Sequence, residues 1–227
     1  HYRGHRNDGP MTKQSAIALM LIPFVMACQA AARANEQAMK GFYLTGAAGM
    51  NGPSPRYNTG SLGTFEEFSD PGFSAELGAG YDFGALRLEA TYALDRSSLK
   101  GYVSVNDRYF SYSEGGSTTK QSAFLTSYWD IFPKQTWTPY LGAGVGYSNL
   151  NVKQFAEPGY AYDGYGRSLL GYQFKAGMSV NLNHKSTLFA EAVYRGTSGF
   201  QTNDGFNNWQ NASFSSWGGQ LGVRIGL

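Results

Sequence analysis

The sequence predicts an all-β protein, an eight-stranded antiparallel up-and-down transmembrane β-barrel, and three observations support this prediction. The 227 residues include 30 Gly, 16 Tyr and 15 Phe but only 15% charged residues, a composition that suits twisted strands with aromatic belts. Apolar residues alternate with polar or small ones through eight segments, as expected when one face of each strand meets lipid and the other lines a barrel. Short turns and long polar connections alternate between these segments.

The first element along the chain is an export signal. Met11–Gln14 is a short basic start, and Ser15–Ala27 is an apolar run that is too short to span a bilayer as a helix. Ala32–Ala34 supplies the small residues that a signal peptidase reads. We therefore expect residues 11–34 to be a signal peptide that is cleaved after Ala34.

This cleavage leaves residues 35–227 as the barrel domain, and we expect residues 1–10 to be an upstream extension. The single cysteine, Cys28, lies in the leader, so the mature domain is expected to contain no disulfide. Two alternatives stay open: Cys28 is acylated as in a lipoprotein, or the apolar run is a buried N-terminal helix. Segment 1–34 holds four of the 18 bases and one of the 16 acids, so the remaining domain is nearly neutral, which argues against nucleic-acid binding.

The first three strands are predicted at Gly41–Met50, Gly72–Asp82 and Ala85–Asp95. The third shows the two-residue period most clearly. A helix would bury Arg87 and Glu89 beside the neighbouring leucines, whereas a strand places the two kinds of side chain on opposite faces. A strand is therefore the better interpretation.

The same alternation continues through five further segments. We predict strands at Lys120–Asp130, Thr136–Leu150, Ser168–Leu182, Ser186–Gly196 and Ser213–Leu227. The total of eight is an even number, as single-chain bacterial barrels require.

The connections between these strands alternate in length. Short turns are expected near Gly84, Pro133 and His184. Long connections are expected at Asn51–Pro71, Arg96–Thr119, Asn151–Arg167 and Thr197–Ala212. Short periplasmic turns and long external loops are the asymmetry of outer-membrane barrels, which places both termini on the periplasmic side. A soluble lipocalin-like barrel is the alternative, but it would turn its large apolar side chains inward, whereas the non-apolar face here carries charges and glycines.

The segment Ser122–Tyr147 carries a family resemblance. It contains Tyr128-Trp129-Asp130 before a turn and then the run Thr138–Gly146 (TPYLGAGVG), and Phe42–Leu44 and Gly222–Leu227 fit the same pattern. This segment resembles the opacity-protein and rickettsial surface-antigen family of eight-stranded outer-membrane β-barrels.

The resemblance implies a bacterial outer-membrane surface protein, a surface antigen or adhesin-like, envelope-stabilising barrel with four long external loops. Some members of that family form pores, so a small passive porin-like channel stays as the alternative. The expected partners are outer-membrane lipid, lipopolysaccharide and a host or environmental surface ligand, and we expect the protein to be a monomer.

Charged residues on the inward face form the first candidate site. They are Glu76, Arg87, Glu89, Lys175, Glu191, Arg195 and Arg224. An ion-selective constriction is one interpretation. Because small barrels fill their interiors with side chains and buried charges must pair, we instead predict a salt-bridged plug.

Aromatic residues form two further candidate sets. Rings that we expect to anchor the barrel at the membrane interfaces are Tyr92, Trp129, Trp137, Tyr147, Tyr194 and Trp217. A candidate ligand loop contains Phe155, Tyr160, Tyr162, Asp163 and Tyr165, because tyrosine gives a large contact area at a small entropic cost. The alternative is that a loop rich in Gly and Tyr only forms a soluble barrel rim.

We expect no catalytic, cofactor or metal site. His184 and Ser186 have the spacing of a base and a nucleophile, but they fall in a short periplasmic turn, away from the lipid of the outer leaflet. The acidic group of Glu66, Glu67 and Asp70 does not have the spacing of a calcium loop.

Overall fold

The computed structural model describes residues 40–227, apart from residues 61–62, 104–108, 112–115, 134, 136, 154, 158–159, 163–164, 204–207 and 212. The predicted extension, signal peptide and Cys28 therefore lie outside the described residues. Within them, no helix is long and apolar enough to cross a membrane.

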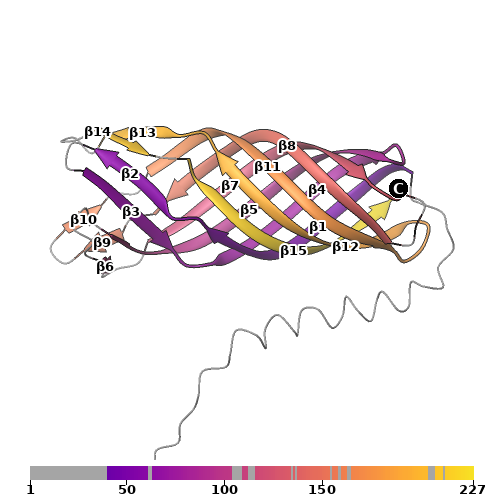
Figure 1. Cartoon of the computed structure of the whole chain (residues 1–227), viewed down its shortest axis with the longest axis horizontal. Coiled ribbons are helices and arrows are strands. Elements are labelled where there is room, and N and C mark those ends of the chain that lie inside the picture. Colours follow the sequence, from indigo (N-terminus) through magenta and orange to yellow (C-terminus); the bar gives the residue numbers. More distant parts are fainter. Residues whose placement is uncertain are drawn as a thin grey trace, which may run out of the picture.

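Eight long strands form a closed barrel (Figure 1). They are β1 (Gly41–Pro53), β4 (Gly72–Asp82), β5 (Leu86–Val103), β7 (Ser117–Asp130), β8 (Trp137–Val152), β11 (Tyr165–Asn181), β12 (Ser186–Thr197) and β15 (Ser215–Gly226). Each pairs antiparallel with its neighbour along the chain, and β1 pairs with β15 to close the ring. The predicted eight-stranded antiparallel barrel is confirmed.

One end of the barrel carries the short turns and the C-terminus, and we call it the turn end (Figure 1). In the turn between β4 and β5, Gly84 has a φ of +110°, which a residue with a side chain rarely adopts. Its amide donates a hydrogen bond to Asp82 Oδ1 at 2.6 Å, and the Phe83 amide donates to the Leu86 carbonyl at 2.9 Å. The turn is therefore fixed by a glycine and an aspartate two residues apart in sequence.

At the opposite, loop end the strands are longer than predicted. β5 continues to Val103 although a loop was expected from Arg96, and β7 already begins at Ser117. β8 extends to Val152 and β11 begins at Tyr165 in the same way. The predicted boundaries are wrong here because the outward face of these stretches is polar and the inward face mixes polar and apolar residues. Their strand conformation is held by backbone pairing with neighbours, as between Ser98 and Ser117, and leaves no apolar alternation in the sequence.

The long connections also contain short strands. These are β2 (Arg56–Gly60), β3 (Gly63–Ser69), β6 (Tyr109–Ser111), β9 (Phe155–Glu157), β10 (Tyr160–Tyr162), β13 (Phe200–Asn203) and β14 (Asn208–Asn211). β2 pairs with β3, β3 with the extension of β5, β14 with β2, and β13 with β14, while β6 pairs with β5. We call β2, β3, β6, β13 and β14 the crown (Figure 1). Three of the four connections predicted as long external loops thus contribute strands to one sheet that is continuous with the barrel.

Candidate functional site

The alternation of the strands turns a row of charged side chains into the lumen. All seven residues predicted to face the lumen are buried there, each 6% exposed or less. Four further charged residues lie with them and were missed: Asp82, Asp95, Lys120 and Asp130. The sequence carried a signal for them, because each shares the inward parity of its strand and is the first or last residue of a predicted strand, but none was included in the predicted ion-pair set.

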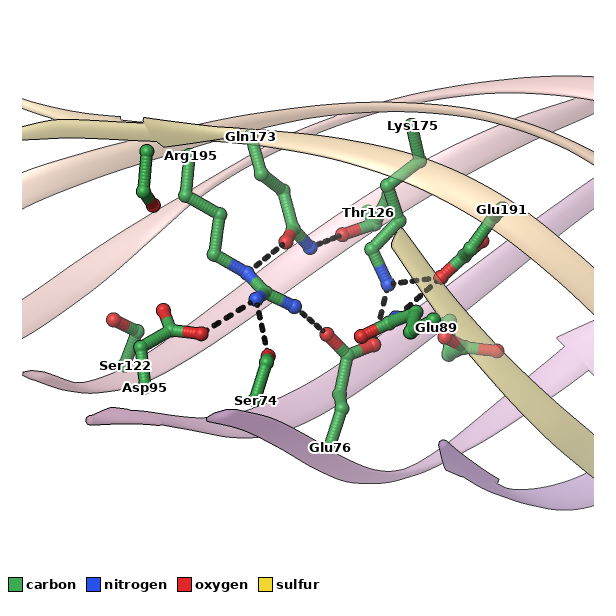
Figure 2. A network of polar contacts seen from close by, with 12 residues as sticks. Ser74, Glu76, Glu89, Asp95, Ser122, Thr126, Gln173, Lys175, Glu191 and Arg195 are labelled. Atoms are coloured by element: carbon green, nitrogen blue, oxygen red, sulfur yellow. Dashed lines mark hydrogen bonds and ion pairs between the residues drawn. The ribbon is translucent and has the colours of Figure 1, made fainter. Parts of the chain in front are cut away.

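A network of ion pairs crosses the middle of the lumen (Figure 2). Glu76 on β4 accepts hydrogen bonds from both Lys175 on β11 and Arg195 on β12. Arg195 also pairs with Asp95 at 3.0 Å, and Lys175 pairs with Glu191 at 3.1 Å. Each of these two cations therefore contacts two carboxylates. Such contacts offset the hydration that a charge loses when it is buried.

Neutral side chains complete this central network. Gln173 accepts a hydrogen bond from Arg195 at 3.2 Å and donates one to Thr126 at 2.7 Å (Figure 2). Ser74 accepts from Arg195 at 3.0 Å. The carboxylate of Glu191 receives a further bond from Gln220 at 2.5 Å. Fixed partners on several strands therefore hold the network in one arrangement.

An apolar cluster closes the lumen at the loop end. It consists of Leu99, Leu150, Val152 and Phe214, and we call it the apolar cap. Lys120 lies between cap and network, with Nζ 5.1 Å from the Phe214 ring and 3.4 Å from a carboxylate oxygen of Asp95. The cap therefore covers the charged network on the side of the loops.

Aromatic rings and arginines fill the turn end, and we call Tyr43, Tyr128, Tyr140, Arg87 and Arg224 the aromatic floor. The guanidinium carbon of Arg87 lies 4.6 Å from the Tyr128 ring centre and 5.0 Å from that of Tyr140. The same guanidinium forms two hydrogen bonds of 2.8 Å with Asp130. These contacts pair one arginine with a carboxylate and two aromatic faces, although its buried Nη1 has no hydrogen-bond partner among the described residues.

The tyrosine hydroxyls join the aromatic floor to the network. Tyr43 and Tyr128 donate to Glu89 at 2.9 and 3.1 Å, and Tyr140 donates to Glu191 at 2.8 Å. Room for the Tyr140 ring comes from Gly177, where an added Cβ would lie 2.6 Å from the phenol. The inward glycines of the sequence thus make space for inward rings.

The side chains of the cap, the network and the floor are each at most 6% exposed, so little open space remains among them. A void beside Arg195 and Ser74 measures about 10 Å³, roughly the room of one water. A groove of about 650 Å³ lies on the outward face, between Trp129 and Trp217, and so opens away from the lumen. From the loop end to the turn end, the lumen is therefore filled by the apolar cap, then the charged network and then the aromatic floor.

The six predicted anchoring rings lie on the outward face, either exposed or half-buried. Trp129 and Trp137 flank the short turn between β7 and β8. Tyr194 and Trp217 stack at a ring-centre distance of 4.6 Å, and Tyr147 is 69% exposed. Tyr92 is exposed partway along β5, below its polar extension.

The predicted ligand loop is described only in its backbone. β9 and β10 form a hairpin in which Phe155 lies opposite Tyr162, and Tyr160 begins β10. Tyr165 is the first residue of β11. Asp163 lies outside the described residues.

The acidic group in the crown is divided among separate partners. Glu67 pairs with Arg56 at 2.5 Å, and Asp70 pairs with Lys100 at 3.3 Å. Glu66 accepts a hydrogen bond from Tyr57 at 3.0 Å, and this bond raises the pKa of the Tyr57 hydroxyl above its usual value. In the described part of the chain, no three His, Cys, Asp or Glu side chains are grouped so as to hold a metal.

Comparison with known proteins places this barrel among bacterial relatives. Residues 19–225 match the family described as "Outer membrane protein beta-barrel domain". The crystal structure of Neisserial surface protein A is similar with a TM-score of 0.52 and 19% identity, covering 82% of this chain and 97% of that one. The outer membrane protein OprG from Pseudomonas aeruginosa is similar with a TM-score of 0.53 and 12% identity, covering 84% and 98%. No protein of curated function matches the sequence.

Proposed function

The chain belongs to the family of outer-membrane β-barrel domains, and we propose that it is a closed barrel that presents its crown and loops to molecules outside the cell. In this role it is a surface antigen or an adhesin-like, envelope-stabilising barrel. The observation that carries the proposal is the filled lumen, since it leaves the external surface as the part of the molecule free to interact.

The lumen argues against the alternative of a passive channel. A permeating ion would have to pass the apolar cap, then separate Arg195 from Glu76 and Asp95, then pass the aromatic floor. Removing one partner of a buried ion pair costs about 3–5 kcal/mol, and several pairs would have to open together. A barrel of eight strands is also just wide enough for its own side chains.

The crown favours a role in recognition. Its strands join the first, second and last connections into one sheet, so their positions relative to one another are fixed by backbone hydrogen bonds. A surface that is already ordered loses less conformational entropy when it binds. The β9–β10 hairpin, with Phe155, Tyr160 and Tyr162, stands beside it as the proposed contact loop.

We propose no catalytic role. His184 is exposed in the turn between β11 and β12, at the turn end of the barrel. An exposed turn offers no water-excluded site in which a serine such as Ser186 could be activated and its product charge stabilised.

Recordings of the purified protein in planar bilayers test the closed lumen. We expect no stepwise conductance above that of the lipid alone. A folded barrel is verified in each preparation by a shift in gel mobility on heating. Reproducible conductance steps from the folded protein would replace the proposal with the channel alternative.

Replacement of residues 155–165 by a Gly/Ser sequence of equal length tests the contact loop. Cells that display the altered protein should lose binding to host cells or matrix, while a Gly/Ser replacement of residues 182–185, in the turn between β11 and β12 at the other end of the barrel, serves as the control. Unchanged binding after the first replacement would remove this hairpin from the proposal.

A further inference from the structure

The outward side of four neighbouring strands becomes polar at the loop end. β5, β7, β8 and β11 extend past the ends of the other barrel strands, and their register aligns outward side chains in rows across them. One such row contains Tyr92, Ala123, Tyr147 and Leu170. Three of the four are large and at least half exposed, so this row belongs to the surface that meets acyl chains.

The next rows toward the loops carry hydrogen-bonding side chains on β7, β8 and β11, although the first of these rows begins with Leu94 on β5. Gln121 lies opposite Asn149, and Asn149 donates to the hydroxyl of Ser168 at 3.4 Å. Thr119 lies opposite Asn151 in the following row. The change from apolar to polar thus happens within one step of the strand alternation.

Two basic side chains flank these polar rows. Arg96 lies opposite Thr119, which lies opposite Asn151, and the amide of Lys153 donates to the Ser117 carbonyl. The two bases are therefore two strands and one outward step (two residues) apart. Both are exposed, and neither forms an ion pair with a residue that the structure describes. Lys100, by contrast, is paired with Asp70.

The opposite side of the barrel differs. On β1, β4 and β15 the outward residues near the loop end are Met50, Phe73 and Trp217, all about half exposed or more. Phe73 lies directly opposite Arg96, so among the described residues the polar and basic surface occupies one wall, which ends at β5. We call its residues the polar wall: Arg96, Thr119, Gln121, Asn149, Asn151, Lys153 and Ser168.

We propose that the polar wall binds the phosphorylated sugar headgroup of an outer-leaflet glycolipid. Phosphate is the group that a free guanidinium and a free ammonium recognise, and amides and hydroxyls suit the polar atoms of sugars. The row beginning at Tyr92 meets the acyl chains of the same lipid. This inference requires the outer-membrane location, but it does not depend on the function of the loops.

The spacing of the bases indicates the number of phosphates. Strands lie about 4.8 Å apart and residues rise about 3.3 Å, so the Cα atoms of Arg96 and Lys153 are separated by about 12 Å. That separation suits a headgroup with a phosphate near each base better than one phosphate shared between them. The fitting ligand is a bis-phosphorylated glycolipid of the lipid A type.

Lipid retention in nanodiscs tests this proposal. The protein is reconstituted with bis-phosphorylated lipid A, monophosphoryl lipid A or phosphatidylglycerol in a phosphatidylcholine background, and retained lipid is counted by native mass spectrometry. The variants are Arg96→Gln/Lys153→Gln and, as the matched control, Lys185→Gln, an exposed base in the turn at the other end. Heat-modifiable gel mobility verifies that each variant is folded.

The wild-type protein should retain bis-phosphorylated lipid A, the monophosphoryl form more weakly, and phosphatidylglycerol least. A basic residue near an anionic surface contributes about 1 kcal/mol, so the double variant should bind about 30-fold more weakly. Lys185→Gln should bind like the wild type. Equal retention by the wild type and the double variant, or equal retention of phosphatidylglycerol, would overturn the proposal.

Discussion

Replacement of Glu76 by glutamine removes the carboxylate at the centre of the lumen network without changing the size of the side chain. Glu76 contacts both Lys175 and Arg195. After the substitution, Lys175 keeps Glu191 at 3.1 Å and Arg195 keeps Asp95 at 3.0 Å. Two buried cations then share two carboxylates in place of three, in a part of the protein that water barely enters.

The expected loss follows from the cost of removing one partner of a buried pair, about 3–5 kcal/mol. Because each cation keeps a second carboxylate, we expect the Glu76→Gln variant to lose about 3 kcal/mol of unfolding free energy, at the low end of that range. The matched control is Glu66→Gln in the crown, where the carboxylate is part-exposed and bonded to Tyr57, and where we expect about 1 kcal/mol or less.

The measurement is equilibrium unfolding in urea of protein folded into lipid vesicles, followed by gel mobility and fluorescence. A double variant, Glu76→Gln with Lys175→Gln, should be destabilised by less than the sum of the two single variants, because the two groups interact directly. If Glu76→Gln lowers the unfolding free energy no more than Glu66→Gln does, the network does not stabilise the barrel and the reasoning is refuted.

Two further substitutions test the packing of the lumen. Gly177→Ala places a Cβ 2.6 Å from the Tyr140 phenol and should lower the unfolding free energy in urea by about 1–3 kcal/mol. The control is Gly219→Ala, where the added Cβ meets no atom within 4 Å and the effect should be nearly neutral. Equal urea midpoints for the two variants would contradict the tight packing around Tyr140. Phe214→Ala opens the apolar cap and should cost about 3–5 kcal/mol while producing no conductance, because the ion pairs below it still fill the lumen. Conductance steps from this variant would mean that the cap alone seals the barrel.

The strand pattern was predictable where the barrel meets lipid, because the two faces of a strand then lie in different solvents. Arg87 and Glu89 alternate with leucines, and this alone fixes their inward direction. Beyond the apolar belt the outward face of β5 is polar, as at Ser98, and its inward face mixes Ser97 with Leu99, so the alternation that marks a strand disappears. The strand ends were misjudged for this reason, whereas Asp95 and Lys120 lay at the ends of predicted strands and were left out of the predicted ion-pair set.

The partners within the lumen were beyond sequence reasoning. Mixed charges on the inward face suggested ion pairs, but the choice of partner depends on the register of every strand between them. Glu76 and Arg195 are 119 residues apart and meet only because the ring closes between β1 and β15. The crown was hidden for a similar reason, since its strands are too short and too polar to show a period.

The pairing of β14 with β2 has a consequence for how the protein is recognised during its biogenesis. These strands come from the last and the first connections of the chain, and they are adjacent only when the first and last barrel strands have joined. A binder whose footprint spans Asn58 and Asn211 would therefore distinguish a completed barrel from every earlier assembly stage. Peptides copied from either segment alone would not reproduce that epitope.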